Sequence, residues 1–145
     1  MKERPLLHMS EKSIEAAAIL FDRIRGVSLS TAELKEIETH FGKNIDTTQI
    51  KDSLLQAISS HPSPTSNYRS LVYWALGKLY DRSLLVFFQQ SLKIERELDL
   101  EVAYQVMIAL DNLDEPVFSR TSLSVFDHQQ NDQDALRYLK SVSGK

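Results

Sequence analysis

The stretch NYRSLVYWALGKLYDRSLLVFF, residues Asn67–Phe88, decides the fold. Its apolar residues recur every three or four positions on both sides of the string YDRS, which is the spacing of α-helices with one buried face. Tyr80–Ser83 therefore predicts a tight turn between two helices. The string ALGKL at Ala75–Leu79 returns as ALDNL at Ala109–Leu113. This recurrence indicates a repeated helical unit, because a helix pair with a single apolar face needs a neighbour to cover it.

Helix-start signals and apolar stripes predict further helices on both sides of this stretch. Ser30 and Glu33 form a capping box, and the other expected starts also carry side chains that can accept a main-chain hydrogen bond. The stripes are expected to face the core, and they include Ile24, Leu34 and Ile94. The expected starts are Ser10, Ser30, Asp46, Ser66 or Asn67, Asp81 or Ser83, Asp99, and Asn131 with Asp134. No segment alternates with a period of two, so the predicted fold class is all-α.

Size and composition fit a single helical domain over residues 1–145. The chain is 42% apolar, which suffices for a hydrophobic core. The string SSHPSPTS, residues 59–66, has the length of a loop between helices rather than of a linker between domains. The absence of cysteine excludes disulfides and thiolate–zinc sites.

Several function classes find no support in the sequence. The four histidines are scattered, and no glycine-rich phosphate-binding motif or nucleophile motif is present, so we expect no catalysis, no metal and no cofactor. The net charge of −3 argues against a nucleic-acid partner, because phosphate binding requires a surplus of Lys and Arg. Neither a signal peptide nor a bilayer-spanning apolar run is predicted, so we expect a cytoplasmic protein with no membrane partner.

The repeated pattern resembles HEAT-type α-helical repeats. In that family the first helix commonly ends in an Ala-Leu-Gly-x-Leu-like string, which a short Asp-containing turn and an aliphatic second helix follow. Here these parts are ALGKLYD, residues 75–81, and SLLVFFQQSL, residues 83–92. The resemblance covers Tyr68–Leu113. It is weaker over Ser10–Ser60, where the signature is missing.

The resemblance implies a short HEAT-like α-solenoid. The second copy departs from the pattern, since Asp111 replaces the glycine and Pro116 prevents the helix from continuing, as in a terminal capping repeat. The alternative architecture is a non-repeating helical bundle of six to seven helices. The expected parts are N-terminal helices over 10–60, HEAT-like helices over 66–115, and a C-terminal loop and capping helix over 116–145.

Acidic residues form the first candidate binding set. The segment Glu95–Glu115 holds seven acids and one base. Such a segment is usually a solvated loop and helix start, and an acid near a helix N-terminus is favourable without any function. Alternatively, the acids pair with Lys and Arg of a basic partner, which speeds association and selects that partner. The candidates are expected to flank one helix, with Glu97, Asp99 and Glu101 at one end and Asp111, Asp114 and Glu115 at the other.

Aromatic residues form the second candidate set. Tyr73 and Trp74 cannot both face the same core as Leu76, because successive helical residues differ by about 100° around the axis. Core packing is expected for Trp74. Tyr73 and Tyr104 are the expected surface residues, since tyrosine is enriched at binding hot spots.

The function implied by the resemblance is protein binding, because HEAT-like repeats usually form concave surfaces that hold another protein. The small size, acidic balance and missing export signal are similar to those of bacterial immunity proteins, including helical ones from contact-dependent growth inhibition systems. That similarity implies a non-catalytic protein that occludes a cognate toxin domain, basic and of the nuclease type. The alternatives are a HEAT-like adaptor or assembly subunit and, third, a nucleic-acid-binding HEAT-like enzyme. The oligomeric state stays open.

Overall fold

The structure, a computed structural model, describes residues 5–59, 64–119 and 124–143, and the regular secondary structure of these parts is helical. These parts contain seven α-helices, one short 3-10 helix (η1) and no strand, which confirms the predicted all-α class and helix number. The chain forms two compact units, Met1–Leu79 and Tyr80–Lys145. The helices are α1 Glu11–Ile24, α2 Thr31–Phe41, α3 Thr47–Ile58, α4 Ser66–Gly77, η1 Arg82–Leu84, α5 Leu85–Leu98, α6 Leu100–Asn112 and α7 His128–Ser143.

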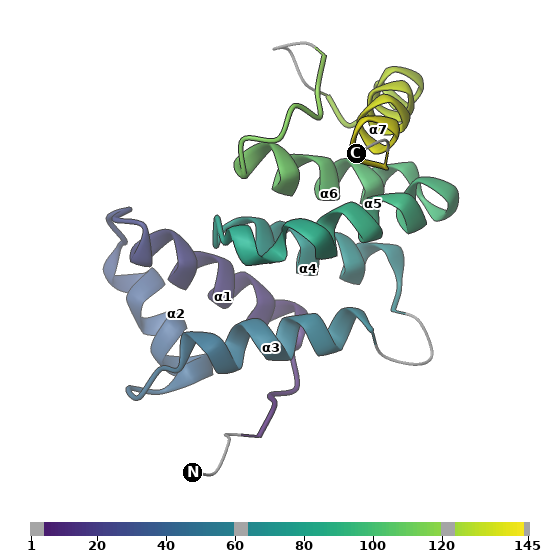
Figure 1. The fold of residues 1–145 in the computed structure, drawn as a ribbon. Coiled ribbons are helices and arrows are strands. Elements are labelled where there is room, and N and C mark those ends of the chain that lie inside the picture. The colour runs from purple at the N-terminus through teal and green to yellow at the C-terminus, as the bar shows by residue number, and fades with distance from the viewer. Residues whose placement is uncertain (1–4, 60–63, 120–123, 144–145) are drawn as a thin grey trace. The chain divides into compact units, whose positions relative to one another are not determined.

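The first unit holds α1 to α4. Helix α1 packs against α2 and α4, and α3 packs against α4 (Figure 1). Fully buried apolar side chains from these helices form its core, among them Ile14, Phe21, Leu54 and Leu76. The predicted caps Ser10, Ser30 and Asp46 each accept a main-chain hydrogen bond at their helix start. Helix α4 is capped by Thr65 rather than by the predicted Ser66 or Asn67.

The second unit holds η1 and α5 to α7. Helices α5 and α6 lie side by side, and α7 packs against both (Figure 1). Helix α7 begins at His128, so the prediction that Asn131 and Asp134 cap it is wrong. Both side chains lie buried inside the helix, where they hold the preceding chain: Asn131 Nδ2 donates to the Ser124 carbonyl, and Asp134 Oδ2 accepts from Ser119 N–H.

Three residues that the stripes predicted in the core are exposed: Ile24, Leu34 and Ile94. Ile24 is the last residue of α1. Helix α2 buries little more than Ile37, so its covered face is too narrow to include Leu34. Ile94 lies about 200° around α5 from the fully buried Leu92 and therefore points away from the core.

The two copies of the repeated string are each followed by a residue with a left-handed φ. Aligning Ala75 with Ala109 places Tyr80 on Asp114, and both have a left-handed φ, of 50° and 63° respectively. After α6 the chain closes a Schellman turn, because Asp114 N–H donates to the Asp111 carbonyl and Glu115 N–H donates to the Leu110 carbonyl. The sequence repeat thus extends to a left-handed residue shortly after each helix, whereas the Schellman turn is seen after α6.

Candidate protein-binding surface

The acids around the junction of α5 and α6 divide into one structural residue and two exposed ones. Asp99 Oδ1 accepts from the main-chain N–H groups of Glu101 (2.9 Å) and Val102 (3.4 Å), so this carboxylate caps α6. Glu101 lies exposed in the first turn of α6. Glu97 is exposed and accepts from Arg96 Nη1 at 2.8 Å. Glu97 and Glu101 therefore remain accessible to a partner, whereas Asp99 stabilises the fold.

At the far end of α6, Glu115 also has a structural role. Its Oε1 accepts from the hydroxyl of the buried Tyr138 at 2.6 Å, and its Oε2 accepts from Arg82 Nη2 at 3.2 Å. Gln89 Nε2 donates to the same hydroxyl at 2.9 Å. Burial and the Glu115 carboxylate raise the pKa of Tyr138 to about 12, so its hydroxyl remains a donor at neutral pH. This network joins α5 and α7 to the chain that follows α6.

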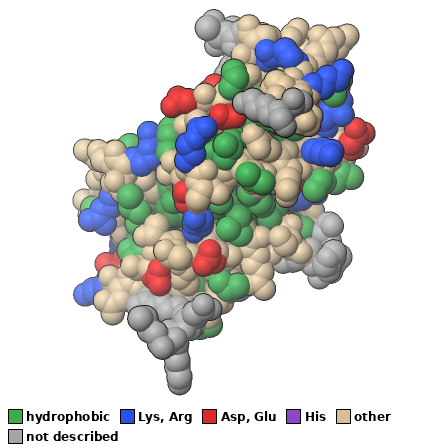
Figure 2. All heavy atoms as spheres, in the orientation of Figure 1, with side chains coloured by type: hydrophobic (Ala, Val, Ile, Leu, Met, Phe, Trp, Pro, Cys, Tyr) green, Lys and Arg blue, Asp and Glu red, His purple; other side chains and the backbone are tan. Residues whose placement is uncertain are grey.

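The other two acids at this end, Asp111 and Asp114, are exposed. Glu101 and Asp111 belong to the first and last turns of the same helix, and ten residues of α-helix span about 15 Å. The accessible acids therefore flank α6 in two groups. Figure 2 shows both acidic and basic side chains on the face that it draws.

An ion pair to α5 and a buried carboxylate that binds the preceding chain hold α7 in place. Arg96 of α5 binds Asp132 with two hydrogen bonds, Nε–Oδ1 at 3.1 Å and Nη2–Oδ2 at 3.2 Å. Burial would raise the pKa of Asp134, but hydrogen bonds from Ser119 and Gln130 and the nearby Arg137 guanidinium hold it below its ordinary value. Asp134 is therefore a buried carboxylate that stabilises the fold in its charged form.

The predicted burial of the two aromatic residues of α4 is wrong for both: Tyr73 was expected at the surface and Trp74 in the core. Tyr73 is 4% exposed and Trp74 is 36% exposed. Helix α4 packs against both α1 and α3, so its covered arc is wide enough to include Tyr73 beside Val72 and Leu76. Trp74 instead lies under Lys78, whose Nζ is 5.7 Å from the ring centroid.

Tyr104 of α6, the other predicted surface aromatic, is half-buried. Its ring packs in a tilted arrangement on Phe118, with 5.9 Å between the ring centroids. Packing between α6 and the chain that follows it explains the position of this tyrosine, so no binding protein is needed to account for it.

The sequence interpretation missed an exposed apolar stripe on α5. Val86, Ile94 and Leu98 are 60%, 59% and 68% exposed and lie on one side of the helix, whose opposite side carries the buried Phe88 and Leu92. Multiples of four residues separate the three, and each step of four advances only about 40° around the axis. That spacing was the signal that could have identified the stripe. We call Val86, Gln90, Lys93, Ile94, Glu97 and Leu98 the outer face of α5.

The outer face of α5 combines apolar area with acids at one end. Ile94, Glu97 and Leu98 are neighbours at spacings of three and four, and the exposed Glu101 follows at the start of α6. Lys93 is an exposed base on this face, whereas Arg96 is engaged by Glu97 and Asp132. An apolar stripe bordered by carboxylates fits a protein surface better than a small polar substrate.

The described residues show no group of three His, Asp or Glu side chains that could hold a metal ion. Over the same ranges, no helix has the length and apolar character needed to cross a bilayer. No family model, curated protein or solved structure matches the chain.

Proposed function

We propose that this chain is a non-catalytic protein-binding module, and that the outer face of α5 is its contact surface. The observation that carries the proposal is the exposure of Val86, Ile94 and Leu98 on a helix whose other side is already buried in a core. Covering such side chains stabilises a complex by about 1.5–3 kcal/mol for each residue that becomes fully buried.

The charges beside this stripe favour a partner with a basic rim around an apolar patch. Glu97 and Glu101 lie next to Ile94 and Leu98 in the chain, and both carboxylates are exposed. Complementary charges speed association and exclude wrong partners, whereas apolar contacts supply most of the affinity. The sequence resemblance implies that this basic partner is a toxin domain of the nuclease type, and neutralising it would make this chain a bacterial immunity protein. A HEAT-like adaptor that holds a subunit of an assembly uses the same surface and is the alternative.

Affinity capture with matched variants tests the proposal. The tagged full-length chain is compared with Ile94→Ser and Leu98→Ser, and with the control Val27→Ser, which changes an exposed valine outside this face. We expect one stoichiometric basic partner that the control retains and that each α5 variant binds about tenfold more weakly. Glu101→Arg should slow association, most strongly at low salt.

Two further outcomes decide between the forms of the proposal. Restored growth when this chain is co-expressed with a toxic partner supports the immunity protein, whereas a multisubunit assembly supports the adaptor. Equal loss of the partner in the control and in the α5 variants would refute the proposed surface. A metabolite turned over by the purified chain would refute the non-catalytic function.

A further inference from the structure

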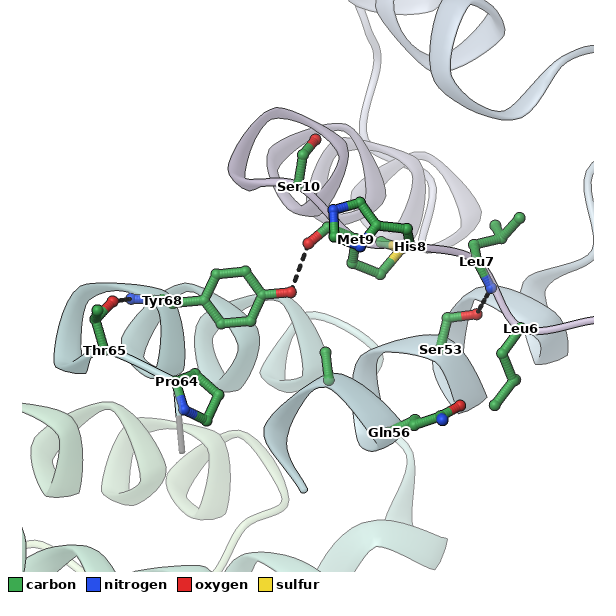
Figure 3. A pocket seen from close by; sticks show the side chains of 11 residues that line it. Leu6, Leu7, His8, Met9, Ser10, Ser53, Gln56, Pro64, Thr65 and Tyr68 are labelled. Atoms are coloured by element: carbon green, nitrogen blue, oxygen red, sulfur yellow. Dashed lines mark hydrogen bonds between the residues drawn. The ribbon is translucent and has the colours of Figure 1, made fainter. Parts of the chain in front are cut away.

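The first unit contains a groove that already holds an extended piece of this chain. Residues 6–10 run past α3 and the start of α4, and they line a cavity of about 630 Å³ together with Ser53, Ala57 and Tyr68 (Figure 3). That volume lies within the usual range of ligand sites, roughly 300–1,000 Å³. The cavity borders the segment itself, so the segment does not fill the groove.

Side chains of α3 and α4 bind the main chain of the segment at every second residue. Gln49 Nε2 donates to the Pro5 carbonyl at 2.7 Å, Leu7 N–H donates to Ser53 Oγ at 2.8 Å, and the Tyr68 hydroxyl donates to the Met9 carbonyl at 2.5 Å. A period of two is that of an extended chain, whose successive residues face opposite sides. Each bond ends on a main-chain group, so the recognition does not depend on which side chains the bound segment carries.

Two of the three groups that make these bonds, the hydroxyls of Ser53 and Tyr68, lie in buried surroundings. Ser53 is buried, and its hydroxyl donates to the Gln49 carbonyl at 2.6 Å, which leaves the oxygen lone pairs to accept from Leu7 N–H. Burial raises the pKa of Tyr68, so its hydroxyl stays protonated and able to donate. Donors and acceptors that the fold holds in place lose little freedom when a peptide binds.

Side-chain contacts of the segment are few. Met9 is 2% exposed, whereas Leu6 is 48% exposed, and Pro5 and His8 are exposed as well. Main-chain hydrogen bonds with one apolar anchor are a known mode of peptide recognition, in which the main chain gives affinity and a pocket gives selectivity.

We propose that the groove between α3 and α4 is a docking site for an extended, uncharged peptide segment of a partner protein, which displaces residues 5–9. The bound peptide presents a carbonyl, an N–H and a carbonyl at alternate residues to Gln49, Ser53 and Tyr68. It places a methionine or leucine where Met9 lies. The site is in the first unit and is independent of the outer face of α5.

Fluorescence anisotropy with the full-length chain tests this site. The probe is a labelled, end-blocked peptide PLLHMS, the sequence of residues 5–10, and the control peptide carries proline in place of the leucine at position 7. In the protein, Leu7→Pro removes the N–H that donates to Ser53 and leaves the groove side chains intact. Because a weaker resident segment frees the groove more often, this variant should bind the probe at least about tenfold more tightly than wild type. The double variant Leu7→Pro/Ser53→Ala should lose that gain, and the control peptide should not bind.

Hydrogen exchange on the unaltered chain provides a second readout that does not depend on the variants folding. Excess probe should increase the exchange rate of the Leu7 amide, because displacement breaks its bond to Ser53 Oγ. Two results would overturn the proposal. One is a Leu7→Pro chain that is folded by circular dichroism and binds no probe at millimolar concentration. The other is probe binding that neither Ser53→Ala nor the control peptide weakens and that leaves Leu7 exchange unchanged.

Discussion

Replacing Tyr138 with phenylalanine is the sharpest test of how the second unit is held together. The substitution keeps the buried ring and removes only the hydroxyl that donates to Glu115 and accepts from Gln89. A hydrogen bond to a charged group contributes about 1.5–3 kcal/mol, and the Gln89 amide also loses its acceptor. Glu115 keeps its contact with Arg82 and is partly exposed, which limits the loss. We expect Tyr138→Phe to lower the free energy of unfolding by about 2 kcal/mol.

Urea unfolding followed by far-UV circular dichroism measures this effect. For a chain of this size, a loss of about 2 kcal/mol moves the midpoint down by roughly 1 M urea. The control is Gln90→Ala, an exposed neighbour of Gln89, which should change the free energy of unfolding by less than about 0.5 kcal/mol. A Tyr138→Phe value as small as that of the control would refute the role of the network.

The same hydroxyl predicts a dependence of stability on high pH. The pKa of Tyr138 is raised from 10.0 to about 12 in the folded chain, so its contribution is complete below pH 10 and is lost as the pH rises towards 12. Other tyrosines and the lysines titrate in the same range. The informative quantity is therefore the difference between wild type and Tyr138→Phe, which should shrink over this interval. A constant difference would contradict the raised pKa.

Three further substitutions have defined expected outcomes. Asp134→Asn should lower the free energy of unfolding at neutral pH, because the fold stabilises the charged form of Asp134. This loss relative to wild type should shrink as the pH falls below 3.8. Equal losses at pH 7 and pH 2 in urea titrations would contradict this. Asp114→Gly should raise the free energy of unfolding by about 0.5–1 kcal/mol, since glycine adopts the left-handed φ of 63° without steric cost, and a lower midpoint would show that the aspartate side chain is needed. Arg96→Lys should lower the free energy of unfolding by about 1 kcal/mol, because lysine cannot form both bonds to Asp132. Asp132→Asn should therefore cost less in combination with Arg96→Lys than alone, and an equal cost would contradict the paired bonds.

Helix starts could be predicted from the sequence because their determinants are local. Ser30 and Glu33 exchange two hydrogen bonds within four residues, and Asp99 caps α6 through N–H groups two and three residues ahead. The failure at α7 shows the limit of this reasoning. Asn131 and Asp134 have the composition of caps, but they bind chain segments that precede the helix, as far back as Ser119. Such partners are set by tertiary structure, which a short sequence window does not contain.

Burial was harder to predict than helix position because it depends on how many neighbours a helix has. Tyr73 is covered since α4 has two packing partners in its unit, and a wider arc of the helix is buried than one apolar stripe suggests. Ile94 shows the converse. An apolar residue two positions after Leu92 lies on the other side of α5, and the sequence interpretation assigned it to the core by composition rather than by angle. The angular position of each residue around the helix axis, rather than its apolar character, distinguishes the stripe of Val86, Ile94 and Leu98 from the core face.

The acids predicted to bind a partner must likewise be divided into structural and exposed residues before any of them is mutated. Reversing the charge of Glu115 would place a cation against Arg82 and remove the acceptor of the Tyr138 hydroxyl, so binding would be lost through misfolding. Asp99 is equally unsuitable because it caps α6. Glu101 and Asp111 are exposed and lie in the first and last turns of that helix, so reversing each in turn changes surface charge at a defined end. A partner seated on the outer face of α5 at the Ile94–Leu98 end should respond to Glu101→Arg more strongly than to Asp111→Arg, because screening at physiological salt limits each charge to about 8 Å.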